Sequence, residues 1–473
     1  MRPIYYLYYV LYLFLMIFLI FFDQRKPRKR FGWILTLVLL PGLGLLLYWF
    51  FGGESFVAYH RRKILQKHKA SLAQLEEITA ETSRRFEPPL SKNILFHQKC
   101  CNSIATSDNE VEIYISGVAK FDRLFADIAR ARDSIHIVYF TIHNDRLGNQ
   151  LIDALVTKVQ QGVEVKLLYD GFGCLATFAY RVVKKLRQAG GSAHCIRPYT
   201  RTINYRNHRK IVIIDGRIGY LGGINVGDHY RDGLGGKRWR DTHIRITGSA
   251  VHDLQKVFFS DWISSVRGTD IGFRQELQHY FPIPATQGKI QAQIVASGLY
   301  NTPQAEIINL SYFNLISRAQ TRLWLQTPYF RPSDAIIMAL KTAAASGVDV
   351  RLMVSLAFGW GNVFNRSLNR YFLRQLVQSE VKVFGYKDIM HAKTLIVDDQ
   401  GLCIGSVNLN TRSLQIDDEI YAYFESKPLV KKYEQVFEHD LNCCIEVDQY
   451  RFEDQGLVSK AIESVLSFLA PLS

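Results

Sequence analysis

The sequence lacks the cysteine spacing of a structural metal site and the glycine-rich loop of a nucleotide-binding site. Seven cysteines are spread over 473 residues, with adjacent pairs at Cys100-Cys101 and Cys443-Cys444, and no C-x-x-C occurs. Zinc sites and dithiol redox motifs are therefore not indicated, and buried free thiols are expected. No G-x-x-x-x-G-K-[ST] segment is present, which excludes P-loop nucleotide chemistry. We expect neither a metal nor a cofactor.

Charged residues are nearly absent from two N-terminal stretches. Residues 4–22 and 31–52 are almost wholly apolar or aromatic, and each could cross a hydrocarbon core as a helix of about 20 residues. Residues 1–52 are therefore predicted to form two transmembrane helices joined by a basic loop, as in a multi-pass protein of the cell (cytoplasmic) membrane. Two spans would place the N-terminus and the remaining chain on one side, but the sequence does not say which. Two buried core helices are the alternative.

Acidic residues are few beside these stretches, so most of the net positive charge of the chain lies in its first 70 residues. The formal net charge of the chain is +15. Residues 1–70 contain 11 Lys or Arg and two Asp or Glu, and thus hold nine of those charges. Cations next to predicted membrane spans favour anionic lipid headgroups as partners over nucleic acid. Control of membrane topology is a second explanation of the same charges.

One eight-residue pattern occurs twice, 183 residues apart. The copies are HRKIVIID, which begins at His208, and HAKTLIVD, which begins at His391. Both read His-x-Lys-x-x-x-x-Asp, and small residues and an Asn follow each copy, as GGIN ending at Asn225 and GSVN ending at Asn408. Repetition of both the motif and its trailer predicts duplicated halves that share one site.

The spacing within each motif indicates a strand that carries chemistry at its start. Alternate side chains of a strand share a face, so His208 and Lys210 project together, as do His391 and Lys393. Two imidazoles and two ammoniums suit a phosphodiester. The ammoniums stabilise charge on the non-bridging oxygens, one imidazole attacks phosphorus, and the other protonates the leaving alcohol.

The other motif residues receive roles by their position. Small residues after each strand leave room for a phosphate to approach the backbone, and Asn225 and Asn408 are expected to add hydrogen bonds to it. Asp215 and Asp398 complete the motifs and are grouped with the catalytic residues. Closing the turn after each strand is the alternative role for both.

Strand and helix patterns alternate in the same order in the two halves. Helices are expected near 121–132 and 148–161 with strands near 135–140 and 163–169, and the second half repeats this order from residue 307. This order predicts an α/β fold with a sheet flanked by helices in each half. The predicted division is a membrane hairpin at residues 1–52, a basic and helical linker at 53–110, and two catalytic halves at 111–280 and 290–473. A last core-packing helix is expected at 457–469, within the second half.

The paired motifs are similar to those of the phospholipase D superfamily. About residues 4–473 further resemble the bacterial cardiolipin synthases of that superfamily, and Asn410 departs from the pattern because many relatives carry Asp there. Apart from the motifs, the stretches that carry the resemblance are LPGLG at 40–44, SIHIVYFTIHNDRLG at 134–148, GVEVKLLYD at 162–170, WRDTH at 239–243, TPYF at 327–330 and APL at 470–472.

The resemblance implies two phospholipase D-like halves and transfer of a phosphatidyl group between two phosphatidylglycerol molecules, giving cardiolipin and glycerol through a phosphohistidine. It implies that His208 is the nucleophile and that His391 is the acid and then the base, although the symmetric motifs also permit the reverse. Asp241 and Glu419 are the carboxylates that would orient the imidazoles, and Asp417 and Asp418 compete with Glu419 for that role.

Three other functions remain alternatives. A hydrolytic phospholipase D, or a transferase that uses another donor or acceptor such as phosphatidylethanolamine, would carry the same motifs. A nuclease fits less well, because only six of the net positive charges belong to residues 71–473. A non-enzymatic membrane scaffold fits poorly with two intact motifs. Oligomeric state is not readable from the sequence.

Overall fold

The computed structural model describes residues 2–22, 27–52, 63, 65–83, 90–175, 179–196, 204–266, 277–284, 288–298, 306–356 and 363–447. The helix expected at 457–469 lies outside these residues. The chain divides into two compact units, one of residues 1–66 with 197–204 and one of residues 67–196 with 205–473. Each unit is described by itself.

The first unit holds the predicted membrane segment as short helices. They are α1 (Arg2–Ile17), the π-helix η1 (Phe18–Phe22), α2 (Pro27–Leu39) and α3 (Pro41–Phe51). The second apolar stretch is divided before Pro41, whose ring cannot continue a helix from the preceding turn. Trp33 and Tyr48 meet edge to face at 5.2 Å, so α2 packs on α3. Among the described helices, none combines the length and apolar character that a bilayer crossing requires, so the two predicted transmembrane helices are not confirmed.

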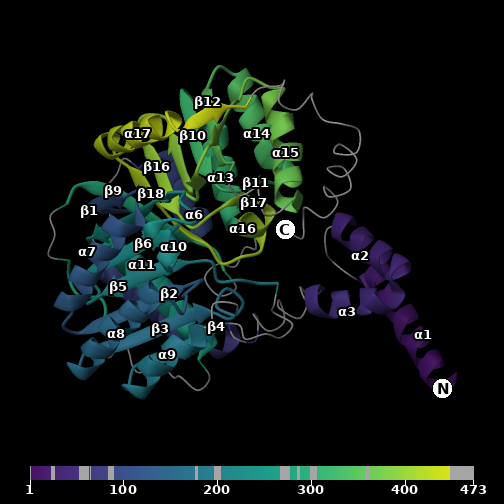
Figure 1. Ribbon diagram of the computed structural model, residues 1–473, viewed down its shortest axis with the longest axis horizontal. Coiled ribbons are helices and arrows are strands. Elements are labelled where there is room, and N and C mark those ends of the chain that lie inside the picture. The colour runs from purple at the N-terminus through teal and green to yellow at the C-terminus, as the bar shows by residue number, and fades with distance from the viewer. Residues whose placement is uncertain are drawn as a thin grey trace. The chain divides into compact units, whose positions relative to one another are not determined.

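The second unit is built on one 15-stranded mixed sheet flanked by helices (Figure 1). Two helices, α5 (Lys69–Thr82) and α6 (Lys92–Cys101), precede it. The elements of the first half are β1 (Thr106–Tyr114), α7 (Gly117–Arg130), β2 (Ser134–Tyr139), α8 (Arg146–Gln160), β3 (Glu164–Asp170), α9 (Ala179–Gln188), β4 (Ser192–Ile196), β5 (Lys210–Ile214), β6 (Ile218–Gly222), α10 (Asp228–Asp232), β7 (Trp239–Arg240), β8 (His243–Thr247) and α11 (Ala250–Ser265).

The second half repeats this order. Its elements are β9 (Ile290–Ala296), α13 (Ile307–Arg318), β10 (Arg322–Thr327), β11 (Phe330–Arg331), α14 (Asp334–Ala345), β12 (Asp349–Ser355), α15 (Val363–Val377), β13 (Lys382–Tyr386), β14 (Ile389–Met390), β15 (Thr394–Val397), β16 (Gly401–Gly405), β17 (Leu409–Asn410), α16 (Thr411–Gln415), β18 (Ile420–Glu425), α17 (Lys427–Leu441) and β19 (Cys444–Glu446).

Strand pairing repeats as well, and it joins the halves. In the first half β2, β3 and β4 are parallel, and β5 pairs antiparallel with β2. In the second half β10, β12 and β13 are parallel, and β15 pairs antiparallel with β10. The sheet continues across the halves because β9 pairs with both β1 and β18. The duplicated α/β fold expected from the repeat is confirmed, while the domain boundaries remain predictions.

The motif strands are buried on both faces, which explains their apolar runs. All of β5 is buried. Ile211 and Ile213 belong to the core cluster that contains α11, and Val212 and Ile214 to the cluster that contains α7 and α8. Lys210 is the first residue of β5 and His208 lies two residues before it, whereas His391 and Lys393 both lie just before β15.

Candidate active site

Backbone hydrogen bonds bring the two motifs to one place. The N–H of His208 donates to the carbonyl of Asp418 at 2.9 Å, and the N–H of His391 donates to the carbonyl of Arg240 at 2.7 Å. Short parallel pairings support both contacts, between Asn207 and Asp418 and between β14 and β7. Each motif histidine is thus fixed to the residue that precedes a carboxylate of the opposite half.

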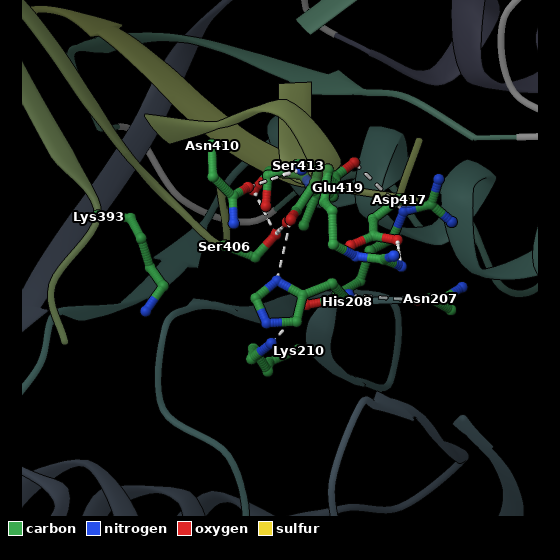
Figure 2. Close-up of polar contacts among 12 residues, drawn as sticks. Asn207, His208, Lys210, Lys393, Ser406, Asn410, Ser413, Asp417 and Glu419 are labelled. Carbon is green, nitrogen blue, oxygen red and sulfur yellow. Dashed lines mark hydrogen bonds and ion pairs between the residues drawn. The ribbon is translucent and has the colours of Figure 1, made fainter. Parts of the chain in front are cut away.

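The two imidazoles face those carboxylates. Nδ1 of His208 lies 2.9 Å from Oε1 of Glu419, and Nδ1 of His391 lies 2.6 Å from Oδ2 of Asp241. Figure 2 shows the His208 ring pointing at the Glu419 carboxylate. A carboxylate on Nδ1 fixes the ring and leaves Nε2 for chemistry. Of the residues that could have competed with Glu419, Asp417 instead accepts from Arg412 at 2.8 Å.

Small residues of the motif trailers hold these carboxylates in place. Ser406 donates its hydroxyl to Oε2 of Glu419. A Cβ atom at Gly223 would lie 2.0 Å from Oδ1 of Asp241, so only glycine leaves space for that carboxylate. The room expected for a phosphate at these positions is therefore occupied by the orienting acids.

The motif lysines are buried beside their own histidines. Lys210 donates to the carbonyl of His208 at 2.5 Å, and Lys393 donates to that of His391. Burial lowers the pKa of Lys210 to about 7, against the attraction of Glu419, and lowers that of Lys393 to about 8. The Lys393 ammonium also lies 2.8 Å from Nδ1 of His391. Because that nitrogen cannot accept from Lys393 while it donates to Asp241, we assign its proton to the shorter contact, with Asp241.

The acids are ionised and His391 is neutral near pH 7. Burial alone would raise the pKa of Asp241, but the Lys393 charge and the contact with His391 outweigh burial and lower that pKa. Likewise, the pKa of Glu419 is lowered because His208 and Lys210 outweigh the effect of burial. Burial, reinforced by the Lys393 charge, lowers the pKa of His391 to about 3. The site thus offers two buried carboxylates, two cations and a neutral imidazole.

The two trailer asparagines differ. Asn225 accepts from the backbone N–H of Thr141 at 3.3 Å and donates to the hydroxyl of Tyr230 at 3.2 Å, so its amide is engaged within the fold. The Oδ1 atom of Asn408 is buried and has no hydrogen-bond partner in the part of the chain that the structure describes. The Oδ1 atom of Asn408 is therefore not engaged within the described part of the fold as that of Asn225 is. Asn410, which departs from the family pattern, caps α16 by accepting from Ser413 at 2.9 Å.

Asp215 and Asp398 lie at the opposite ends of β5 and β15 from the histidines. Both adopt a φ of 52°, in the left-handed region. Asp215 accepts backbone N–H groups of residues 132–134 at 2.8–3.2 Å, and Asp398 accepts those of 320–322 at 2.7–3.3 Å. They tie the turn after each strand to the start of its neighbour. These contacts support the turn-closing alternative and not their grouping with the catalytic residues.

Two buried arginines that the sequence reading did not select support the carboxylates. Arg209 forms an ion pair with Asp261 and donates to the carbonyl of Ser297 and, at 3.4 Å, to that of Glu419.

The second arginine is Arg240, which precedes Asp241. It pairs with Asp440 at 2.8 Å and donates to the carbonyl of Asp241 at 2.7 Å. Asp261, a charged residue within the otherwise apolar segment VFFSDWI, was the sequence signal for the first pair.

Comparison with known proteins leads to the same family that the paired motifs resemble. The family model described as "Cardiolipin synthase, PLD-like domain" matches residues 124–262 and 312–441, and "Phospholipase_D-nuclease N-terminal" matches residues 10–53. The cardiolipin synthase of Listeria monocytogenes (strain F2365) is 33% identical over 475 residues, covering 96% of this chain and 95% of its own. The major cardiolipin synthase ClsA of Bacillus subtilis is 34% identical over 471 residues, with the same coverage.

A solved structure agrees in fold. The phosphatidylserine synthase of Haemophilus influenzae superposes with a TM-score of 0.62 at 16% identity, covering 81% of this chain and 100% of that one. The match of one domain model to both halves, together with the near full-length identity to curated relatives, establishes the family. The chain belongs to the cardiolipin synthase family of phospholipase D-like proteins.

Proposed function

We propose that this protein is a cardiolipin synthase that transfers a phosphatidyl group from one phosphatidylglycerol to another and releases glycerol. The observation that supports it most is the pairing of each motif histidine with a carboxylate of the opposite half, at 2.9 and 2.6 Å. This arrangement gives two oriented imidazoles and two buried ammoniums around one point, in a chain of the matching family.

In the first step Nε2 of His208 attacks phosphorus. The bond from phosphorus to the glycerol oxygen breaks, and that oxygen takes a proton from His391. Lys210 and Lys393 stabilise the charge on the non-bridging oxygens, and Glu419 stabilises the positive charge that develops on His208. The product is a phosphatidyl-histidine and free glycerol.

In the second step the reaction runs in the opposite sense. A hydroxyl of a second phosphatidylglycerol gives its proton to His391 and attacks phosphorus, and the phosphorus–nitrogen bond breaks. One phosphodiester has replaced another, so no nucleotide is consumed. Preference for an alcohol over water requires a site from which water is excluded.

His391 has to gain a proton when the substrate binds, before it can act as the acid. Burial and the Lys393 charge lower the pKa of His391 to about 3. A bound phosphodiester offsets the lysine charges and raises that pKa, so His391 takes up a proton on binding. Reversed roles, with the neutral His391 as nucleophile, are the second mechanism that this observation favours.

We further propose that residues 1–52 associate with the membrane as two spans and so deliver the site to lipid. The match of residues 10–53 to an N-terminal domain model and the nine net positive charges in residues 1–70 support this. Anionic phosphatidylglycerol is the matching surface.

A lipid assay on the purified full-length chain tests the function. Labelled phosphatidylglycerol vesicles are supplied without nucleotide and with a metal chelator, beside His208→Ala and His391→Ala. The control is His194→Ala on β4, a partly exposed ring that contacts Trp262 and lies outside the motifs. Cardiolipin and glycerol, lost in both motif variants and kept in the control, support the proposal. Phosphatidic acid as the sole product would indicate a hydrolase.

A further inference from the structure

A set of aromatic rings leads away from His391 along the first half. The ring of Trp239 lies 5.3 Å from that of His391, and the ring of Tyr230 lies 6.3 Å from it. The ring of His229 lies 5.1 Å from that of Trp239, and the ring of His143 lies 4.8 Å from that of His229. We name His143, His229, Tyr230 and Trp239 the aromatic shelf.

The two histidines of the shelf keep their polar atoms unused. Both rings are partly exposed, and within the described residues neither ring forms a hydrogen bond. Burial lowers the pKa of His229 to about 4, with a contribution from His143, and burial also lowers the pKa of His143. Both are therefore neutral near pH 7, and each offers one N–H donor and one nitrogen acceptor.

The fold holds these rings rigidly. The backbone N–H of His143 donates to the carbonyl of Val226 at 2.9 Å. Asp145 caps α8 by accepting from Gly148 at 3.0 Å, and its second oxygen accepts from the N–H of Asp228 at 2.7 Å. The segments that carry His143 and His229 are thus hydrogen-bonded to each other, so the two imidazoles form a preorganised binding surface.

The chemistry of the shelf matches a neutral polyol. An anion is disfavoured because the carboxylates of Asp145 and Asp228 lie within electrostatic range of both imidazoles. Arg146, the nearby cation, is already paired with Asp228 and Asp232. Adjacent hydroxyls can donate to and accept from two neutral imidazoles, while the C–H groups of a polyol pack on an aromatic face such as that of Trp239.

We propose that His143 and His229 bind the vicinal hydroxyls of the glycerol headgroup, with its carbons against Trp239. This rests on the proposed function, in which His391 protonates the departing glycerol, and the shelf begins at that histidine. The two residues then bind and position the alcohol and take no part in proton transfer.

A comparison of two donors tests the subsite. Phosphatidylglycerol carries the diol, and phosphatidylethanol has a similar linkage without hydroxyls on its headgroup. Release of each labelled alcohol is measured in mixed micelles for the full-length chain and for the double variant His143→Phe/His229→Phe, which keeps the rings and removes the nitrogens. We expect the preference for phosphatidylglycerol, as a ratio of kcat/KM values, to fall roughly tenfold, with phosphatidylethanol cleavage within about threefold of wild type.

Two further variants separate binding from packing. His143→Gln/His229→Gln keeps a donor and an acceptor at each position and is expected to recover part of the preference. His194→Phe places the same substitution on another partly exposed ring, at Trp262, and should leave the ratio unchanged. An equal loss for both donors in the Phe variant, or an unchanged ratio, would overturn the proposal. Because the ratio does not depend on the acceptor, it tests the subsite even if the enzyme hydrolyses lipid and makes no cardiolipin.

Discussion

The Oε1 atom of Glu419 lies 2.9 Å from Nδ1 of His208, although the two residues are 211 positions apart and belong to opposite halves. The Asp241–His391 contact is the same relationship in the reverse direction, at 2.6 Å. Each half therefore supplies the histidine of one pair and the carboxylate of the other. Neither half contains a complete pair, and the catalytic unit requires both.

Glu419→Gln and Asp241→Asn should keep the shape of the site and remove a charge that stabilises an imidazolium. We expect kcat to fall at least about 100-fold in each, with a small change in KM, because the lost stabilisation belongs to the transition state. Steady-state kinetics in phosphatidylglycerol micelles measures both. Asp417→Asn is the matched control, since Asp417 pairs with Arg412. A rise in KM with kcat unchanged would mean that the carboxylates bind substrate and do not orient the histidines.

Asp215→Asn and Asp398→Asn should affect folding and not chemistry. Each carboxylate accepts several backbone N–H groups at a turn with φ of 52°, so we expect a loss of about 1–3 kcal/mol of stability per substitution. Asparagine tolerates the left-handed conformation, which confines the effect to the lost charge-assisted bonds. Thermal unfolding and kcat per folded molecule are the measurements. A loss of kcat above tenfold in well-folded protein would return these aspartates to the catalytic set.

Activity should decline on the alkaline side because the buried ammoniums lose their protons early. Burial lowers the pKa of Lys210 to about 7 and that of Lys393 to about 8. Both values lie below the ordinary value, so the cations are present below this range and are lost as pH rises through it. We expect kcat/KM, which reports the free enzyme, to fall between about pH 7 and 8.

Lys393→Arg supplies the control for this pH dependence. A guanidinium keeps its charge, so any residual activity of the variant should decline at a higher pH than that of the wild type. If the activity of Lys393→Arg declines over the same pH range as that of the wild type, the decline belongs to another group.

The Asp440–Arg240 ion pair should be needed for stability. Both side chains are buried and 2.8 Å apart, and Asp440→Asn leaves the guanidinium charge uncompensated. We expect a loss of about 3–5 kcal/mol, since a buried charge without its partner is costly. Asp232→Asn, which breaks the exposed Arg146–Asp232 pair, should change stability by at most about 1 kcal/mol. Chemical denaturation compares the two variants.

The sequence predicted the features that follow from local periodicity. His208 and Lys210, at positions i and i+2 before an apolar run, predicted a buried strand and a common face for the two side chains. The second motif made the same prediction, and the structure has a buried strand after each histidine. The roles of Asp241 and Glu419 came from family resemblance, because contacts 150 and 211 positions apart depend on strand order.

The two similar trailers have different surroundings in the fold. Asn225 meets the hydroxyl of Tyr230 at 3.2 Å, while the Oδ1 atom of Asn408 has no partner among the described residues. Gly223 and Ser406 leave space for a carboxylate and not a phosphate, because Asp241 and Glu419, each further along the same half, fill that space. No local pattern carries that information.

The most direct test is to find the residue that carries phosphorus during turnover. Full-length enzyme is mixed with phosphatidylglycerol labelled in its phosphate, quenched in alkaline denaturant, under which phosphohistidine persists, and digested for peptide mapping. We expect label on the peptide that contains His208 in the wild type and no label in His208→Ala. Label on the His391 peptide would reverse the two roles, and cardiolipin formation without label on either histidine would contradict a covalent mechanism at this site.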